Sequence, residues 1–466
     1  MNTTFNGTKD FSSIINSIKI GDIIDIILQD NVCITGRYMP RYESSTKDHI
    51  VIKLKSGYNI GLNTKNIRSI KISSENNIKN NKSIKEQKKN NDLLKTNIQS
   101  KQNNTLPKIL LLSTGGTIAS KIDYRTGGVK SLLSASDIYS SIPELIKYAY
   151  IDTEVLINEY SENIEPIHWT LIANKVAEKC RSEKYQGIII SHGTDTMSYT
   201  AAALSFALQK LSIPVVLVGA QRSSDRPSSD ASSNLIGAIR FITNFEYSGV
   251  YVAMHNSTSD DIIACHIGTR VRKNHTSKRN AFESIGIDPI AIVKNDRIEI
   301  SRYISTLNLH KKNTNHSNVE AISKFDNNVF LLKFFPGFHP KIIDTIYNQG
   351  YKIIIIEGTG LGHINKNCIS SIKNVIDNGI LVFMTSQCIW GRTNLSVYDN
   401  GRDLRDIGII PLYNMLSETA VVKAMWLLAN NNNNNNDDEN TTLHDYIKLK
   451  MKENLANEIL HFSLIQ

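Results

Sequence analysis

Five short apolar runs, separated by turn-forming residues, occupy the first part of the chain. They cover residues 21–28, 32–38, 49–54, 58–62 and 67–72. Runs of this length, rich in isoleucine and bounded by polar turns such as QDN and SSTKD, are typical of the short strands of an all-β module. The pattern predicts a small β-barrel of the SH3 or Tudor-like type in a first domain, residues 1–73.

Two other stretches lack the regularly spaced apolar positions of a folded element. Residues 74–106 are rich in Lys and Asn, so we expect a flexible linker that cannot bury enough surface to fold alone. Residues 430–436 are an unbroken asparagine tract, which predicts a disordered surface insertion. An amphipathic helix is expected after it, from Tyr446 to Leu460.

From Ile109 onward the chain shows short, continuous apolar runs that each end in a polar loop. ILLLS leads into TGGTIAS, GIIIS into HGTDT, PVVLVGA into QRSSDRPSSD, and GVYVAM into HNSTSDD. Such runs are typical of strands covered on both faces, and helical stretches at 169–184 and 234–243 lie between them. The alternation predicts a large parallel α/β domain at 107–297, with ligands at the carboxyl ends of its strands.

A second, weaker α/β pattern follows. We expect a smaller C-terminal α/β domain, residues 328–466, joined to the large domain by an irregular crossover at 298–327. Its apolar runs and its closing helical stretch lie at 329–337, 352–357, 379–385 and 420–428.

Composition and charge place few limits on function. The chain has no apolar run long enough to span a membrane, and its polar N-terminus lacks the features of a signal peptide, so we expect a cytoplasmic protein without membrane contact. Its five widely spaced cysteines include no CxxC pair, which argues against disulfides and a zinc site. The net charge of +9 suits a polyanionic partner such as RNA. An abundance of Lys, Asn and Ile, which A/T-rich codons specify, explains this charge equally well.

Two hydroxyl-rich loops are the candidates for chemistry. TGGTIAS begins at Thr114 and HGTDT places Thr194 beside Asp195, each directly after a predicted buried strand. A tight glycine turn or a helix cap would explain either loop alone. If the two strands are neighbours, however, a cleft at their ends would bring the two loops face to face.

A threonine hydroxyl needs help to act as a nucleophile. Acyl transfer requires a base, a group that orients the base, and donors for the developing oxyanion. Lys273, in RVRKNHTSKRN, could be the base and Asp195 could orient it, while the glycine loop could supply backbone donors. A solvated surface cation is the alternative for Lys273 in this basic stretch.

The two threonine loops, in this order and followed by a lysine after CHIGTRVR, resemble the two signature segments of the type-I/II L-asparaginase and glutaminase family. The resemblance runs from about Leu106 to about Leu428. It implies a two-domain parallel-sheet core and an amide hydrolysis through a threonine acyl-enzyme. It also implies the catalytic residues Thr114, Thr194, Asp195, Lys273 and Tyr124, with Tyr124 assisting Thr114 from a mobile loop, and the substrate-binding residues Ser161 and Glu162.

Within that family, the chain resembles the archaeal D subunits of glutamyl-tRNA(Gln) amidotransferase. The resemblance includes the N-terminal β-module with GDII, SEN at 161–163, IWGRTNLSVYDNGRDL and MLSETAVVKAMWLLAN. It implies that glutamine is hydrolysed and that ammonia passes to a partner, the E subunit of the amidotransferase, which uses ATP with Mg to amidate Glu-tRNA(Gln). The chain itself would need no cofactor or metal, and would form a homodimer within a heterotetramer.

Two other functions remain open from the residues. A stand-alone cytoplasmic L-asparaginase would use the same core but would not need the N-terminal module. A non-catalytic RNA-binding protein would suit the positive charge but would leave the two hydroxyl loops and Lys273 without a role. Ammonia release by the purified chain separates the RNA-binding protein from both enzymes.

Overall fold

A computed structural model provides the fold. It describes residues 18, 21–39, 48–54, 59–72, 106–116, 120–122, 129–131, 142–182, 185–222, 229–258, 262–294, 297–313, 319–430 and 442–461. Apart from Leu106, the predicted linker lies outside these residues, and so does the asparagine tract after Asn430. The chain divides into two compact units, one with the N-terminal strands and one with most of the chain from Pro107 onward.

The N-terminal module is a five-stranded antiparallel sheet in the order β4-β3-β2-β1-β5. Alternate residues point to one side, so that Ile24, Ile26, Ile50, Ile52 and Ile70 form its buried core. The five predicted strands are confirmed within one or two residues. They are β1 (Ile23–Leu28), β2 (Cys33–Met39), β3 (His49–Lys53), β4 (Asn59–Asn63) and β5 (Ile67–Ile72).

The large α/β domain contains an eight-stranded sheet in the order β17-β16-β13-β12-β11-β10-β6-β9. Its parallel part holds β6 (Lys108–Gly115), β9 (Tyr150–Glu159), β10 (Gly187–Ser191), β11 (Pro214–Val218) and β12 (Gly249–His255). This part confirms the predicted parallel sheet.

The rest of this sheet is antiparallel, which the sequence pattern did not predict. It is formed by β13 (Ile262–Ile267), β16 (Ala291–Lys294) and β17 (Arg297–Ile300). The connection from β12 to β13 is too short for the helical crossover that a parallel pair requires, so the chain folds directly back. β17 also extends the sheet into the stretch predicted as an irregular crossover.

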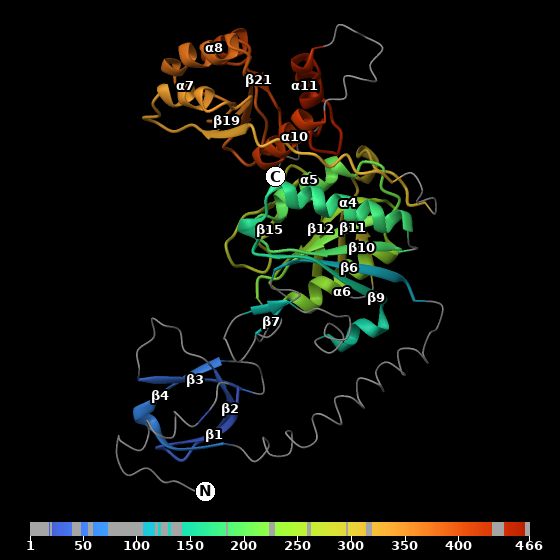
Figure 1. Cartoon of the computed structure of the whole chain (residues 1–466), viewed down its shortest axis with the longest axis vertical. Helices are drawn as coiled ribbons and strands as arrows, with labels where there is room; N and C mark the ends of the chain where they lie inside the picture. Colours follow the sequence, from blue (N-terminus) through green and yellow to red (C-terminus); the bar gives the residue numbers. More distant parts are fainter. Residues whose placement is uncertain are drawn as a thin grey trace. The chain divides into compact units, whose positions relative to one another are not determined.

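Helices cover both faces of the sheet. α4 (Pro166–Ser182) and α5 (Met197–Ala207) lie on one face and α6 (Ala231–Asn244) on the other (Figure 1). Leu110 and Leu112 of β6 share a buried cluster with Ile172 of α4. On the opposite face, the Ile242 side chain of α6 packs against Gly187. A β-carbon added to Gly187 would lie 2.5 Å from that side chain. None of the described helices is both long and apolar enough to cross a membrane.

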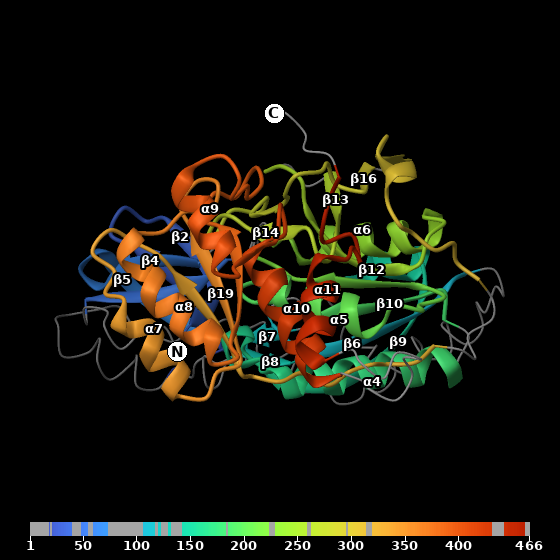
Figure 2. The same ribbon diagram turned by 90° about the horizontal axis from the view of Figure 1, so that it is seen from above.

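The C-terminal domain is built on a four-stranded parallel sheet in the order β18-β19-β20-β21. Alternate residues of β19 face two different layers, since Ile355 shares a cluster with α10 whereas Ile356 shares one with α7 and α8. α10 also packs against both α5 and α11 (Figure 2). The elements are β18 (Val329–Lys333), α7 (Lys341–Asn348), β19 (Ile353–Gly358), α8 (Ile369–Asp377), β20 (Leu381–Ser386), α9 (Asp399–Asp406), β21 (Ile410–Pro411), α10 (Ser417–Ala429) and α11 (Leu443–Lys452).

The last helix is shorter than predicted. α11 ends at Lys452, and the expectation that it continues to Leu460 is wrong. Glu458 is fully buried, pairs with Lys423 at 2.5 Å and accepts the backbone amides of Leu455 and Ala456. A carboxylate that accepts hydrogen bonds from amides two and three residues earlier in the chain holds that stretch in a turn and not in a helix.

Candidate active site

The two threonine loops lie at the ends of neighbouring parallel strands, as predicted. β6 and β10 pair in register, with Ser113 opposite Ser191. Thr114 directly follows Ser113, and the HGTDT loop directly follows Ser191. The Thr114 hydroxyl donates a hydrogen bond to the Ser191 carbonyl at 2.8 Å, and the side chain is buried. This bond joins the two loops at their base.

Glycines allow the backbones of these loops to touch. A β-carbon on Gly116, where φ is +78°, would lie 2.7 Å from the backbone of His192 and Gly193. A β-carbon on Gly193 would lie 2.7 Å from that of Ser161, and one on Gly219 would lie 2.8 Å from the Thr194 methyl group. Since real contacts of this kind are never so short, a larger residue would push the loops apart.

Lys273 approaches the second loop from a separate hairpin of β14 (Val271–Lys273) and β15 (Phe282–Ser284). Its Nζ donates to the Thr194 hydroxyl at 2.8 Å and to the Asp195 carboxylate at 2.7 Å. The Lys273 side chain is 12% exposed and that of Asp195 is 67% exposed. The structure therefore joins a hydroxyl, an amine and a carboxylate in one half-buried cluster.

Ser161 and Glu162 lie at the same end of the sheet. They form the start of a short 3-10 helix, η3 (Ser161–Asn163), which follows β9, the neighbour of β6. Ser161 is buried against Gly193, and its carbonyl accepts the Thr196 hydroxyl at 2.6 Å. Glu162 is exposed at the next position. Both residues therefore border the threonine loops.

Tyr124 lies outside the described residues, between β7 (Ser120–Ile122) and β8 (Val129–Ser131). Its predicted role therefore stays a prediction. The structure brings the six other predicted residues to one end of the large sheet: Thr114, Ser161, Glu162, Thr194, Asp195 and Lys273.

Sequence reasoning missed the residues that support the second loop. The His192 ring is buried, with Nδ1 2.7 Å from the Gly193 carbonyl and Nε2 2.9 Å from the Thr200 hydroxyl. Trp169 donates to the same hydroxyl at 3.1 Å. Burial lowers the pKa of His192 to about 4, partly offset by the bond to Gly193, so the ring is neutral near pH 7. The signal was present in the sequence, because HGTDT begins with this histidine.

The cluster can support attack by a hydroxyl on a carbonyl carbon. It combines a hydroxyl, an amine and a carboxylate, the kinds of group that can serve as nucleophile, base and orienting group in covalent acyl transfer. Among the described residues, no three or more His, Cys, Asp or Glu side chains are grouped so that they could hold a metal ion.

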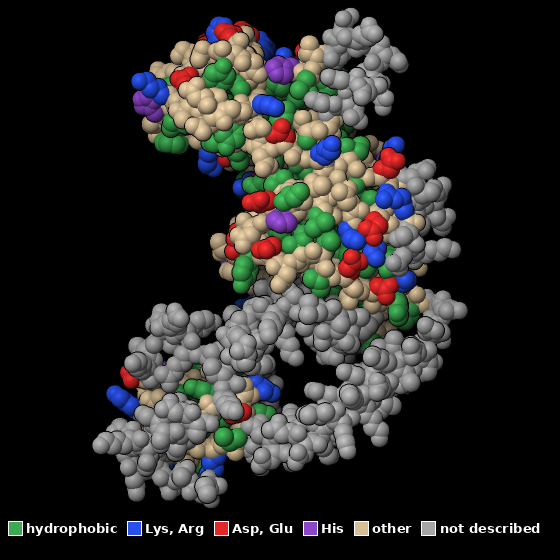
Figure 3. All heavy atoms as spheres, in the orientation of Figure 1, with side chains coloured by type: hydrophobic (Ala, Val, Ile, Leu, Met, Phe, Trp, Pro, Cys, Tyr) green, Lys and Arg blue, Asp and Glu red, His purple; other side chains and the backbone are tan. Residues whose placement is uncertain are grey.

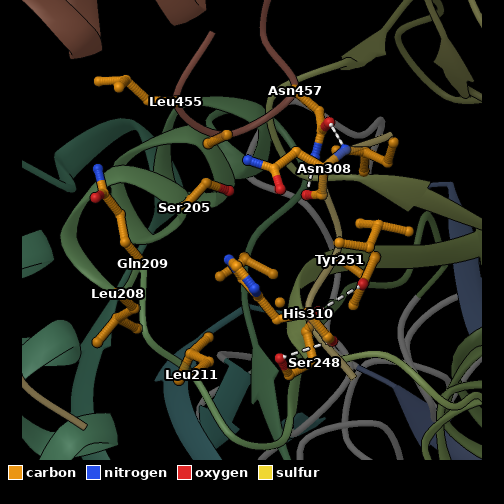
Figure 4. A pocket seen from close by; sticks show the side chains of 15 residues that line it. Ser205, Leu208, Gln209, Leu211, Ser248, Tyr251, Asn308, His310, Leu455 and Asn457 are labelled. Atoms are coloured by element: carbon orange, nitrogen blue, oxygen red, sulfur yellow. Dashed lines mark hydrogen bonds between the residues drawn. The ribbon is translucent and has the colours of Figure 1, made fainter. Parts of the chain in front are cut away.

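A small cleft opens elsewhere on this unit. It is lined by the start of β12, the end of α5 and the C-terminal tail, and contains none of the predicted site residues (Figure 4). Asn308 and Asn457 bond to one another across it at 2.8 and 3.0 Å. Because β12 begins here, this cleft lies at the end of the sheet opposite the threonine loops.

Charge does not single out another site on the face shown in Figure 3. Over the α/β part of the molecule, Lys and Arg side chains are interspersed with Asp and Glu side chains on this face. Examples in the same unit are the pairs of Lys108 with Asp152 at 3.0 Å and of Lys175 with Glu154 at 3.3 Å.

Three family models match the chain in succession. The GatD N-terminal domain matches residues 18–72, the N-terminal asparaginase domain matches 108–305, and the glutaminase/asparaginase C-terminal domain matches 328–438. The first match coincides with the five-stranded module, and the second includes every predicted site residue.

Curated relatives match over nearly the whole chain. The chain is 44% identical over 451 residues to the D subunit of glutamyl-tRNA(Gln) amidotransferase from Pyrococcus abyssi, with 96% of both chains covered. It is 41% identical to the D subunit from Methanopyrus kandleri, covering 89% of this chain and 88% of the relative. The match to the Pyrococcus abyssi subunit leaves too few residues over to exclude the N-terminal module.

Solved structures of L-asparaginases match a shorter part. The thermostable L-asparaginase from Thermococcus kodakarensis aligns with a TM-score of 0.65 at 33% identity, covering 76% of this chain and 99% of its own. The L-asparaginase I from Vibrio cholerae gives a TM-score of 0.64 at 26% identity, covering 77% and 100%. These enzymes therefore correspond to about three quarters of the chain.

Proposed function

The chain belongs to the family of glutamyl-tRNA(Gln) amidotransferase D subunits, and we propose on this basis that it is the glutaminase subunit of that enzyme. It would hydrolyse glutamine and supply the ammonia that converts Glu-tRNA(Gln) to Gln-tRNA(Gln). The observation that supports this most strongly is similarity over 96% of the chain to a D subunit, together with the match of residues 18–72 to the GatD N-terminal domain.

The proposed chemistry proceeds through a threonine ester. A threonine hydroxyl attacks the carbon of the glutamine side-chain amide, the C–N bond breaks, and ammonia leaves with the proton that the hydroxyl gave up. Water then attacks the ester, releasing glutamate and restoring the hydroxyl. The contacts of Lys273 with Thr194 and Asp195, at 2.8 and 2.7 Å, support Lys273 as the base and Asp195 as its orienting group.

Thr114 is the second hydroxyl that this proposal uses. Its hydroxyl donates to the Ser191 carbonyl at 2.8 Å, at the base of the loop that bears Thr194. Tyr124 is proposed to assist Thr114, on the strength of its place in the family's active-site loop. In this scheme one of the two threonines forms the ester and the other assists the attack, so both are required for full turnover.

The head group of glutamine carries an ammonium and a carboxylate. We propose that Ser161, Glu162 and Asp195 hold it. Glu162 and Asp195 are both exposed carboxylates and suit the ammonium group, whereas Ser161 offers a hydroxyl to the carboxylate. Bound in this way beside the threonine loops, glutamine would extend its side-chain amide toward the reactive hydroxyls.

The partners follow from the reaction. Ammonia is proposed to pass to the E subunit of the amidotransferase, which would bind ATP with Mg and the Glu-tRNA(Gln) substrate, while this chain uses no cofactor or metal. The setting would be the cytoplasm, where tRNA is aminoacylated.

A homodimer within a heterotetramer is proposed for the assembly. Phe335, Trp390, Tyr398 and Tyr413 support it, because these large side chains are 40–60% exposed in segments that follow β18, β20 and β21. Exposed aromatic groups gathered at one end of a sheet are typical of a protein interface.

A stand-alone L-asparaginase is the second candidate, favoured by the structural match to the Thermococcus kodakarensis enzyme. The two functions differ in substrate and in dependence on a partner. Ammonia release should be measured with glutamine and with asparagine, each with and without the E subunit and Glu-tRNA(Gln). We expect release from glutamine, increased by the partner and the tRNA. Asparagine as the preferred substrate, with no effect of either addition, would support the asparaginase instead.

A further inference from the structure

His192 lies behind the HGTDT loop and not in the cleft. Its side chain is fully buried, and both ring nitrogens have protein partners, the Gly193 carbonyl at 2.7 Å and the Thr200 hydroxyl at 2.9 Å. A ring placed in this way cannot touch the substrate. Whatever it contributes must reach the reaction through the loop it contacts.

The neighbours of His192 fix which ring nitrogen holds the proton. The Trp169 indole can only donate, so the Thr200 hydroxyl accepts from it at 3.1 Å. Nδ1 faces a carbonyl, which can only accept, so the proton of the neutral ring lies on Nδ1. Nε2 is then free to accept the proton of the Thr200 hydroxyl. The three side chains form a directional chain of hydrogen bonds that ends at the Gly193 carbonyl.

That carbonyl lies at the centre of the reactive loop. The loop is anchored at one end by the His192 amide, which donates to the Val218 carbonyl at 3.0 Å. At the other end, the Thr196 hydroxyl donates to the Ser161 carbonyl at 2.6 Å. Between these anchors, the bond from the His192 ring orients the peptide that joins Gly193 to Thr194, and hence the Thr194 hydroxyl that Lys273 reaches at 2.8 Å.

We propose that His192 is a positioning residue, which uses its Nδ1–H bond to the Gly193 carbonyl to hold the Thr194 hydroxyl within reach of Lys273. The proposal rests on the proposed glutaminase function for its kinetic readout. Misplacing a reacting group by about 1 Å can lower the rate by about a hundredfold, so a loss of this bond should lower kcat. Thr200 and Trp169 act one step further away, by keeping Nε2 an acceptor.

Two substitutions of His192 separate positioning from simple packing. The amide nitrogen of asparagine can take the place of Nδ1, so His192→Asn can still donate to the Gly193 carbonyl. The amide of glutamine reaches the place of Nε2, so His192→Gln keeps the Thr200 contact and loses the Gly193 bond. Both variants remove an aromatic ring from the core, which makes each the control for the other.

The kinetic constants for glutamine and the thermal unfolding midpoint should be measured for both variants and for the wild type. We expect His192→Asn to keep kcat within about threefold of wild type and His192→Gln to lose about ten- to a hundredfold. KM should change little, because other residues hold the head group. Equal kcat values in the two variants, once each is shown to be folded, would overturn the proposal.

Crystal structures of the two variants give a readout that does not require activity. The distance from Lys273 Nζ to Thr194 Oγ1, 2.8 Å in the wild type, should be kept in His192→Asn and lengthened in His192→Gln. An unchanged distance in His192→Gln would also overturn the proposal. A wild-type chain that lacks glutaminase activity with the E subunit and Glu-tRNA(Gln) would refute the proposed function, and the two structures would still decide the role of His192.

Thr200→Val provides a second route if His192→Gln does not fold. It keeps the shape of the side chain but removes the hydroxyl that fixes Nε2 as the acceptor. We expect a fall in kcat in the wild-type background and no further fall in a His192→Asn background, where Nε2 is absent. Equal losses in both backgrounds would show that Thr200 acts independently of His192, contrary to the proposal.

Discussion

At the scale of single residues, the Lys273 amine is the group on which the proposed chemistry depends. It contacts both the Thr194 hydroxyl and the Asp195 carboxylate, and its side chain is only 12% exposed. An alkyl hydroxyl becomes a useful nucleophile only beside a base. In the arrangement described, Lys273 donates to Thr194, so it must first lose a proton before it can accept one. The exposed Asp195 carboxylate connects the amine to solvent.

Removal of either reactive hydroxyl should abolish amide hydrolysis without unfolding the protein. Thr114→Ala and Thr194→Ala should each lower the rate of ammonia release from glutamine by at least about a thousandfold, a typical loss for a nucleophile or its activating unit. Thr243→Ala is a suitable control, because its hydroxyl donates to two carbonyls and accepts from the Asn244 amide, all within its own helix. A wild-type rate in either active-site variant, at normal thermal stability, would refute the assignment.

Replacing Lys273 by methionine keeps the apolar stem and removes the amine. Since a general base contributes about a hundred- to ten-thousandfold, we expect turnover to fall within that range. Lys278→Met tests the same change at an exposed position of the same basic stretch and should leave turnover unchanged. If Lys273→Met turns over glutamine as fast as the wild type, Lys273 is only a surface cation.

At the scale of elements, local patterns of apolar and turn-forming residues predicted the strands and loops that depend on local contacts. The strands of the N-terminal module and the parallel strands followed from apolar runs and turns, and the threonine loops followed from their place after those strands. The antiparallel part of the large sheet could not be predicted, because β16 and β17 depend on strand pairing and not on a distinct apolar pattern. Tyr124, outside the described residues, remains a prediction.

Contacts between distant residues account for the other differences. The early end of α11 depends on the ion pair of Glu458 with Lys423, which lies 35 residues away. The support of the second loop depends on Trp169, 31 residues before Thr200. Neither of these two contacts can be inferred from the spacing of residues in the sequence, since Lys423, Glu458 and Trp169 would fit equally well in an ordinary helix or an ordinary core.

The buried pair of Lys423 and Glu458 gives a test of how the C-terminal tail is held. Both side chains are fully buried, at 2.5 Å from one another. Burial lowers the pKa of Lys423, whereas the Glu458 carboxylate opposes that change. Lys423→Met would leave the carboxylate without its cation, so the free energy of unfolding should fall by about 3–5 kcal/mol.

Urea unfolding measures this change. The double variant Lys423→Met with Glu458→Gln should recover part of the loss, because the glutamine oxygen can still accept the amides of Leu455 and Ala456 without carrying a charge. If Lys423→Met unfolds at the wild-type urea concentration, the pair does not stabilise the tail.

At the scale of the whole molecule, the chain combines a module with an asparaginase-like core. The matched asparaginases cover about three quarters of the chain, whereas the Pyrococcus abyssi D subunit covers 96% of it, and residues 18–72 match the GatD N-terminal domain. All the site residues proposed for hydrolysis lie after Pro107, and none lies in the module. We therefore expect the module to serve either the binding of the partner and the tRNA or the stability of the core.

Deletion of residues 1–73 distinguishes these two roles. We expect basal glutamine hydrolysis to remain nearly intact and coupled formation of Gln-tRNA(Gln) to fall sharply, because positioning of the E subunit would be lost. Both rates should be measured together with the thermal unfolding midpoint. A truncated chain that loses hydrolysis and unfolds many degrees lower would show that the module braces the core instead.

The most direct test of the proposed function compares two nitrogen donors. Gln-tRNA(Gln) formation should be measured in the complex with the E subunit, ATP, Mg and Glu-tRNA(Gln), with either glutamine or an ammonium salt as the donor. We expect the wild type to use both donors. Thr194→Ala should lose glutamine-dependent formation by about a thousandfold and keep ammonium-dependent formation, because only ammonia production depends on this chain. Wild-type rates with glutamine in Thr194→Ala, or a wild-type complex that cannot use glutamine, would contradict the proposal.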